Sequence, residues 1–364
     1  MKKQIFYTAL VLFAVCGNVF AGSLQPSAAP APTMKTLDEV EPRIAIPGGS
    51  FDTTYTISSP GSYYLAGNRT LTANVTGIKV DANNVTIDLM GYTLAGNGVR
   101  YNNCNGITIN YEQSTNSGRK NVEIRNGTIS NFGSSGISAP NIAIKDIRII
   151  NIRSVANKQQ GMALYNSGNR IDNCLVAENE DEGIYAGRNS ILTGCIARDN
   201  NDTGIHVISG SIVTSCYSFS NNGSGIYLAG SGTISNSVCY ENTGTGIVGV
   251  EGCTIIGNTA RSNGSNGISG TGVIKDNYSS GNHLLGISAG DGTTVTNNTA
   301  VGNNDGFYIS SGCTVIGNSA SDNAHWGFCM GGGSLLDQNT AINNPWGNIS
   351  LLTGCTVPSG NHAP

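Results

Sequence analysis

The sequence predicts an all-β fold: a right-handed, single-stranded parallel β-helix, which is a three-sheet solenoid with about 21 residues per rung. Three observations support this prediction. A Gly followed by an apolar residue recurs ten times, at intervals of 25, 22, 21, 21, 21, 21, 19, 20 and 21 residues. The intervals contain short β-branched segments bounded by Gly or Asn, which are typical of strands. The chain has 50 glycines and only 12% charged residues, a composition that favours turns and strands over helices.

The N-terminal residues lie outside this repeat. Residues 1–21 are expected to be a secretory signal peptide, because two lysines precede an apolar stretch that ends in a small-residue pattern at Ala21. Lipid modification of Cys16 is the alternative, but Val15 is larger than the small residue that such processing requires. Residues 22–43 are rich in Pro and Ala and are expected to form an extended linker. No later stretch is long and apolar enough to span a bilayer.

The repeat assigns residues 44–357 to the β-helix domain and leaves residues 358–364 as a C-terminal tail. In one rung, residues 253–256 (CTII) form the second strand and residues 258–260 (NTA) form the third. One rung cannot bury its own apolar face, but rungs stacked about 4.8 Å apart bury Ile under Ile and pair every strand in parallel. Repeats of about six residues per face would indicate the left-handed form, so the longer intervals favour the right-handed one.

Two further columns follow from the repeat. Asparagine recurs four residues before the glycine, where stacked amides can hydrogen-bond along the solenoid and tolerate a left-handed corner, so this column is structural. Cys174, Cys195 and Cys216 share a position five residues before the asparagine. We expect packed thiols there, because in-register side chains point the same way and make a disulfide difficult. The asparagines of the column are Asn179, Asn200, Asn221, Asn242, Asn263, Asn282, Asn323 and Asn343.

The first rungs carry a pattern that is specific for the fold. Residues 55–68 (YTISSPGSYYLAGN) and 77–89 (GIKVDANNVTIDL) resemble the first rungs of bacterial right-handed β-helix repeat proteins of the pectate-lyase-like superfamily. The resemblance covers about residues 44–357. It implies no single activity, because the superfamily includes polysaccharide lyases, glycoside hydrolases, uronan epimerases, phage tailspikes, adhesins and copper-enzyme maturation proteins. Wider glycine spacing in this part predicts protruding loops within residues 101–121 and 153–160, and loops of this superfamily commonly wall a binding groove.

The residue after each Gly-Ile pair should point outward by strand alternation, and this column includes Tyr185, His206 and Tyr227. Acidic residues precede the column, and Arg188 follows it. The patch fits a sugar-binding site in which Tyr185, Tyr227 and Arg188 contact the substrate, or a catalytic site in which carboxylates act as acid and base or hold Ca²⁺. A solvated turn beside a stabilising aromatic ladder is the third possibility. The catalytic candidates are Asp181, Glu182, Asp202 and His206.

A second, charged column is expected on the second strand of successive rungs, formed by Asp88, Arg125, Lys145 and Asp172. Cations beside an aspartate are what a uronate lyase needs to neutralise a carboxylate and abstract a proton, so Lys145 and Asp172 are further catalytic candidates. Opposite charges on neighbouring strands can instead simply pair, with a stabilisation of at most about 1 kcal/mol. We favour this pairing over catalysis.

The sequence therefore favours a secreted or periplasmic β-helix repeat protein that binds an extracellular polysaccharide or glycan, or serves as a structural surface or matrix module. The alternative is a polysaccharide lyase, glycoside hydrolase or uronan epimerase, with its groove between the residue 100–120 loop and Tyr185. Lyase signatures and the epimerase Asp-Pro-His run cannot be placed. A net charge of −4 without a basic cluster argues against a nucleic-acid surface. No metal site or cofactor is expected, apart from Ca²⁺ in a lyase.

Overall fold

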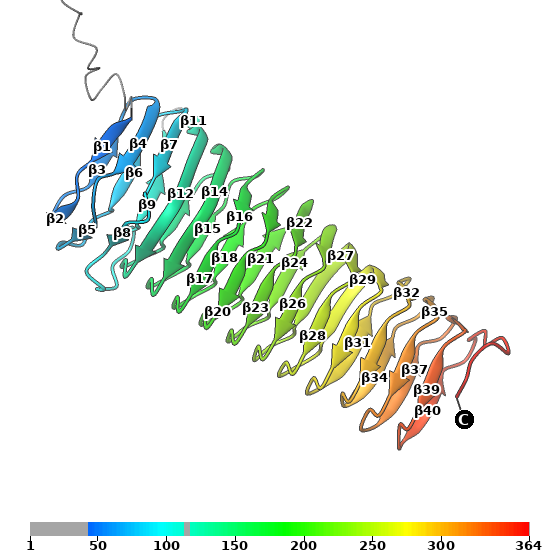
Figure 1. Ribbon diagram of the computed structural model, residues 1–364. Helices are drawn as coiled ribbons and strands as arrows, with labels where there is room; N and C mark the ends of the chain where they lie inside the picture. Colours follow the sequence, from blue (N-terminus) through cyan, green and yellow to red (C-terminus); the bar gives the residue numbers. More distant parts are fainter. Residues whose placement is uncertain (1–42, 113–116, 364) are drawn as a thin grey trace, which may run out of the picture. The chain divides into compact units, whose positions relative to one another are not determined.

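The computed structural model describes residues 43–112 and 117–363, and in these ranges the chain is all β, without a helix. The strands form a right-handed parallel β-solenoid of about 14 turns of about 21 residues, as predicted. Figure 1 shows the rungs following one another along the solenoid from β1 to β40. The expected signal peptide and all of the expected linker except Arg43 lie outside the described residues. No helix that could cross a membrane occurs in the described ranges.

Nearly every rung contributes one strand, or part of a longer strand, to each of three parallel faces, which we call sheets 1, 2 and 3. Sheet 1 contains β3 (Tyr55–Ile57), β6 (Ile78–Val80), β9 (Ile107–Ile109), β13 (Ile137–Ala139), β15 (Met162–Leu164), β18 (Ile184–Ala186), β21 (Ile205–Ile208), β24 (Ile226–Ala229), the first parts of β27 (Ile247–Ile256) and β29 (Ile268–Lys275), β31 (Leu285–Ala289), β34 (Asp305–Ile309), β37 (Trp326–Met330) and β40 (Gly347–Leu351). Sheet 2 contains β1 (Ile44–Ile46), β4 (Gly61–Leu65), β7 (Val85–Asp88), the first parts of β12 (Lys120–Ser130) and β14 (Lys145–Val155), β16 (Arg170–Asp172), β19 (Ile191–Thr193), β22 (Ser211–Thr214), β25 (Gly232–Ser235), the ends of β27 and β29, β32 (Thr294–Thr296), β35 (Thr314–Ile316) and β38 (Leu335–Asp337). Sheet 3 contains β2 (Gly49–Phe51), β5 (Arg69–Leu71), β8 (Thr93–Ala95), the ends of β12 and β14, β17 (Leu175–Ala177), β20 (Ile196–Arg198), β23 (Tyr217–Phe219), β26 (Val238–Tyr240), β28 (Thr259–Arg261), β30 (Tyr278–Ser280), β33 (Thr299–Val301), β36 (Ser319–Ser321) and β39 (Thr340–Ile342).

The core is a set of apolar columns inside the solenoid. Ile184 pairs with Ile205, and Ile205 with Ile226, and all three side chains are fully buried. Near the C-terminal end the same column continues with Phe307 and Phe328, whose rings stack with 4.6 Å between centroids. Like side chains therefore lie one above another at the strand spacing, which removes their apolar surface from water.

The predicted asparagine column forms a buried ladder that satisfies the backbone at the corner after sheet 3. In each step an amide oxygen accepts from the preceding asparagine, as Asn221 does from the backbone N–H and Nδ2 of Asn200 at 3.1 and 2.9 Å. Asn343 is a correction: Asn344 occupies the ladder and accepts from Asn323, while Asn343 bonds Asp322. The rung is one residue longer at this corner, and the glycine position is taken by Asn348.

The cysteine column is also present. Cys174, Cys195 and Cys216 are buried in register, and the backbone N–H of Cys216 donates to Ser237, which begins the run of polar residues in later rungs. The N–H of Ser237 in turn donates to Asn258 at 2.9 Å. All nine cysteines of the described ranges are unpaired. The position therefore changes from thiols to amides along the solenoid without a change in backbone course.

The predicted loops differ from those in the structure. The segment 101–121 is divided by β9 of sheet 1 into a loop before this strand and a small hairpin, β10 (Tyr111–Glu112) and β11 (Ser117–Gly118), after it. Residues 153–155 belong to β14 and pair with β17, so only a corner remains of the second predicted loop. Pairing also continues past Val357, the predicted end of the domain, because His362 bridges to Thr340.

Candidate functional site

The predicted aromatic column lies on the outer face of sheet 1. Tyr185 of β18 pairs with His206 of β21, which pairs with Tyr227 of β24. The ring centroids are 4.9 Å apart at both steps, and the rings meet edge to face. Strand alternation and a constant rung length of 21 residues are sufficient to bring these three side chains together, and both were visible in the sequence.

Tyr165 extends this column by one ring, and sequence reasoning missed it. It lies directly after β15, two residues beyond the column position, which Ala163 occupies in that rung. Its ring reaches back to Tyr185, with 4.7 Å between centroids and an interplanar angle of 37°. The side chain is 44% exposed and forms the outer end of the column. No repeat position predicted this contact, because it depends on the turn after β15.

The acidic candidates lie at the start of the sheet 1 strands. Glu182 Oε1 is 2.7 Å from His206 Nδ1, so the carboxylate orients the imidazole of the next rung. Asp181 accepts a hydrogen bond of 2.7 Å from Gln160. Asp202 accepts one of 2.7 Å from the N–H of Thr203. The structure thus brings Glu182 and His206 into direct contact, whereas Asp181 and Asp202 have other partners.

Burial and charge shift the protonation of this acidic group. Burial, together with the charges of Glu182 and Asp202, raises the pKa of Asp181 above its usual range. Burial and the charge of Glu182 also raise the pKa of the Tyr185 hydroxyl. Asp181 therefore retains its proton to a higher pH than an exposed aspartate does.

The neighbouring Glu180 is occupied by ion pairs rather than available to a ligand. Its two carboxylate oxygens lie 2.5 Å from Lys158 Nζ and 2.5 Å from Arg100 Nη2. The hydrogen bonds from these two cations lower the pKa of Glu180. Because Arg100 lies in the loop before β9, this contact ties that loop to the rung of β18.

A hollow of about 550 Å³ opens at the other end of the column, where the chain turns from sheet 1 to sheet 2. Two tyrosine rings and two cations converge on it, and the cations, Lys145 and Arg188, are exposed. Neither cation has an acidic partner in the described part of the chain. The residues around the hollow are Ile142, Lys145, Tyr165, Ser167, Tyr185, Gly187, Arg188 and Ile208.

The predicted charged column on sheet 2 contains one wrong member. Asp88 pairs with Arg125, but Arg125 pairs with Ile150, which in turn pairs with Asp172. Lys145 lies five positions earlier and pairs with Lys120. This part of the solenoid has a rung of 25 residues, from Arg125 to Ile150, so a prediction based on shorter rungs misplaced Lys145. Lys145 contributes to the hollow instead.

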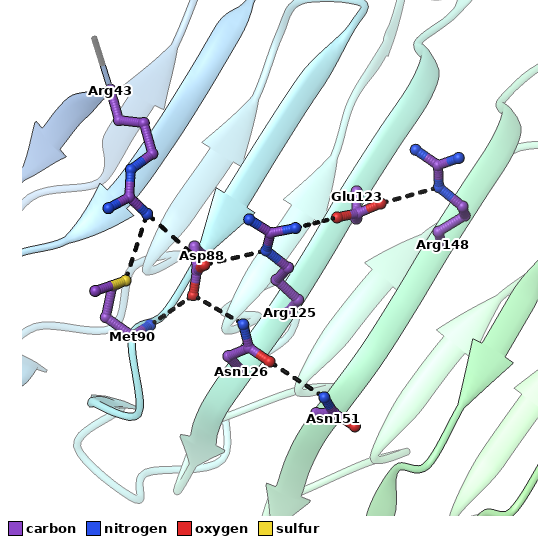
Figure 2. Close-up of polar contacts among 8 residues, drawn as sticks. All are labelled: Arg43, Asp88, Met90, Glu123, Arg125, Asn126, Arg148 and Asn151. Carbon is purple, nitrogen blue, oxygen red and sulfur yellow. Dashed lines mark hydrogen bonds and ion pairs between the residues drawn. The ribbon is translucent and has the colours of Figure 1, made fainter. Parts of the chain in front are cut away.

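The remaining members of the charged column form ion pairs, as favoured from the sequence (Figure 2). Arg125 Nε lies 3.0 Å from Asp88 Oδ2, and its Nη1 lies 3.1 Å from Glu123 Oε1. Glu123 also contacts Arg148 at 3.1 Å. Burial opposes the ionisation of Asp88, but hydrogen bonds from the Met90 N–H, Asn126 and Arg125, with the charge of Arg125, lower its pKa overall.

Asp172 is separated from the other catalytic candidates. Its carboxylate lies 2.7 Å from Arg170 Nε in the same strand, β16, on sheet 2. No group of three or more His, Cys, Asp or Glu side chains within residues 43–112 and 117–363 is arranged to hold a metal ion. The chemistry on the page is therefore that of rings, carboxylates, one imidazole and two unpaired cations.

The repeat and the solenoid define the class of this protein. A family model described as a right-handed beta helix region matches residues 58–230 and 141–273, more than half of the chain. The protein therefore belongs to the right-handed β-helix family. No curated protein matches it in sequence.

Solved structures share the fold at low sequence identity. The A-module of the mannuronan C-5 epimerase AlgE4 from Azotobacter vinelandii is 16% identical, over 86% of this chain and 91% of that chain, with a TM-score of 0.52. The A-module of AlgE6 from the same organism is 17% identical, over 87% and 91%, with a TM-score of 0.47. The periplasmic alginate epimerase AlgG is 11% identical, over 85% and 78%, with a TM-score of 0.39.

Proposed function

We propose that this is an exported glycan-binding protein, and that the hollow beside Tyr165 and Tyr185 binds a uronic acid residue of a polysaccharide. The observation that carries the proposal is the pair of unpaired cations, Lys145 and Arg188, at the mouth of a hollow lined by tyrosine rings. The apolar faces of sugars pack on aromatic rings, and a guanidinium can hold a carboxylate with two hydrogen bonds.

The charge distribution supports an acidic ligand in this hollow. The nearest carboxylates, Asp181 and Glu182, lie at the opposite end of the Tyr185 strand and are engaged with Gln160 and His206. They leave the positive end of the column uncompensated. A uronate at this end would supply the missing negative charge, whereas a neutral sugar would leave both cations without a partner.

Export is part of the same proposal. The signal peptide expected over residues 1–21 and the linker expected over residues 22–43 would deliver the solenoid to the outside of the membrane, where acidic polysaccharides occur. Among solved proteins with this fold, a mannuronan epimerase provides an example of a β-helix that acts on a uronate polymer. Its likeness to this chain is one of fold.

Binding of mannuronate and galacturonate oligomers, measured by isothermal titration calorimetry, tests the proposal. Lys145→Ala and Arg188→Ala should each weaken binding about tenfold, since a hydrogen bond to a charged group contributes about 1.5–3 kcal/mol. Tyr185→Ala should also weaken it. Lys275→Ala, an exposed lysine on sheet 2, and Tyr217→Ala, a tyrosine on sheet 3, are the matched controls. Wild-type affinity in all three hollow variants, or no uronate binding at all, would overturn the proposal.

A uronan lyase or epimerase is a second candidate, favoured by the contact between Glu182 and His206. A carboxylate that orients an imidazole is a common arrangement for general base catalysis. Oligomers incubated with the protein should then yield an unsaturated product that absorbs in the ultraviolet, or an altered ratio of C-5 epimers by NMR. Either activity should be lost in His206→Ala. Binding without turnover assigns the protein to the glycan-binding class.

A further inference from the structure

Two more hollows open on sheet 1 near the C-terminal end of the solenoid, one on each side of Tyr308. The first has a volume of about 510 Å³ and the second about 330 Å³. The first lies at the start of the strands and is surrounded by Asn266, Leu284, Leu285, Ser288, Asn304, Asp305 and Tyr308. The second lies at their ends and includes Asp291, Tyr308, Ser310, Ser311, Cys329 and Ser350.

Tyr308 differs from the rings of the first column in having no aromatic neighbour on either side. It pairs with Ser288 on one rung and with Cys329 on the next, and both side chains are small. The side chain is 52% exposed. Both faces of its ring are therefore open to a ligand, whereas the faces of Tyr185 are partly covered by Tyr165 and His206.

The charge around Tyr308 is opposite to that of the hollow at Tyr185. Asp305 uses Oδ1 to accept from the Trp326 N–H at 3.0 Å, and Asp291 uses Oδ1 to accept from the Ser311 N–H at 2.9 Å. The second oxygen of Asp291 remains available, and no Lys or Arg lines either hollow. Carboxylates of this kind accept hydrogen bonds from sugar hydroxyls and repel a uronate.

Both sites lie on the same outer column of sheet 1. From Tyr227 the register runs through Val248, Ser269 and Ser288 to Tyr308. Tyr185 and Tyr308 are six rungs apart, which corresponds to about 29 Å at the spacing of parallel strands. A linear polysaccharide lying along the solenoid axis would therefore reach both sites.

We propose that Tyr308, Asp291 and Asp305 form a second glycan site, specific for neutral sugar residues, and that one linear acidic heteropolysaccharide occupies both sites. The second part of this inference rests on the proposed function of the hollow at Tyr185. Uronate units of the polymer lie against Lys145 and Arg188, and neutral units stack on Tyr308. Two linked sites bind a long chain more tightly than either site binds a short oligomer.

The test uses three probes: cellohexaose, which is neutral; mannuronate oligomers, which are uniformly acidic; and gellan, a linear polymer of glucose, glucuronate and rhamnose. Tyr308→Ala should abolish binding of cellohexaose and weaken gellan binding about tenfold, because loss of a stacking platform costs about 1.4 kcal/mol. Tyr278→Ala, a similarly exposed tyrosine on sheet 3, is the control. The more conservative Asp305→Asn keeps the acceptor for the Trp326 N–H and should weaken cellohexaose binding less.

The two proposals fail separately. If Tyr308→Ala binds cellohexaose and gellan as the wild type does, or if the wild type binds neither, the second site is overturned whatever mannuronate does. If cellohexaose binding depends on Tyr308 while mannuronate oligomers do not bind, the uronate hollow fails and the neutral site stands. Melting curves of each variant confirm that a loss of binding is not a loss of fold.

Discussion

The first rungs, residues 43–155, and the later rungs, residues 156–363, use different polar contacts between neighbouring rungs. In the first rungs, sheet 2 carries a chain of ion pairs that runs from Asp88 through Arg125 and Glu123 to Arg148. In the later rungs, buried asparagines repeat at two corners and bond only to the backbone and to one another, as Asn200 and Asn221 do. The first arrangement is charged and partly exposed, and the second is neutral and buried.

The difference follows rung length. Rungs of nearly constant length put the same corner at the same place each time, so a single residue type can repeat there and satisfy every corner. The first rungs vary in length, and their contacts are matched individually, as the tie between Arg100 and Glu180 across three rungs illustrates. Regular rungs should therefore depend on a few buried amides, whereas irregular rungs should respond to pH and salt.

The largest expected effect is that of Asn221→Ala. The Asn221 amide donates to Asn242 at 3.0 Å and to the Ala197 carbonyl at 3.1 Å, and its oxygen accepts from Asn200. Its removal leaves buried donors and acceptors unpaired, so the free energy of unfolding should fall by about 2–4 kcal/mol in urea titrations. Asn222→Ala, at an exposed neighbouring position, should change it by less than about 0.5 kcal/mol. Equal effects would contradict the comparison.

A smaller effect is expected for Arg125→Ala. This arginine is 37% exposed, but its partners Asp88 and Glu123 are only 7% and 13% exposed. Leaving both without it should cost about 1–2 kcal/mol at low salt and less at high salt. Arg170→Ala removes a more exposed arginine of the same sheet and should cost less. Salt independence of the Arg125→Ala effect would exclude an ionic origin.

Acid should weaken the first rungs selectively. Because the pKa of Asp88 is lower in the folded chain than in the unfolded one, its stabilising contribution is complete above its usual value of 3.8 and is lost as the pH falls through the folded pKa. Asp88→Asn should therefore lose less stability than the wild type between about pH 5 and about pH 3. Thermal melts over this range measure the difference, and parallel curves would refute it.

The smallest effect is expected for Asp181→Asn. The pKa of Asp181 is raised in the folded chain, so the wild type binds this proton more tightly when folded and loses the associated stability as the pH rises through the raised pKa. The asparagine keeps an acceptor for Gln160 and carries no charge. It should melt slightly above the wild type at neutral pH, with no gain in acid. A gain at all pH values would indicate a cause other than ionisation.

Several features could be predicted because they depend only on residues about one rung apart. The column of Tyr185, His206 and Tyr227 and the ladder around Asn221 both lie where successive rungs have 21 residues. In that interval, positions in the chain convert directly into neighbours in space. The favoured interpretation of the charged column, pairing between Asp88 and Arg125, was confirmed for the same reason, since both lie at one position of adjacent strands.

Other features required the folded chain. Lys145 and Asn343 were misplaced because their rungs differ in length from the repeat, and a shift of five residues or of one residue moves a side chain to another face or corner. Tyr165, Lys145 and Arg188 lie outside the repeated position and meet only through the turns from sheet 1 to sheet 2. Repetition of residue types determines which strands stack, whereas the course of each turn decides which exposed side chains share a hollow. Turn geometry has no period, so it cannot be read from spacing.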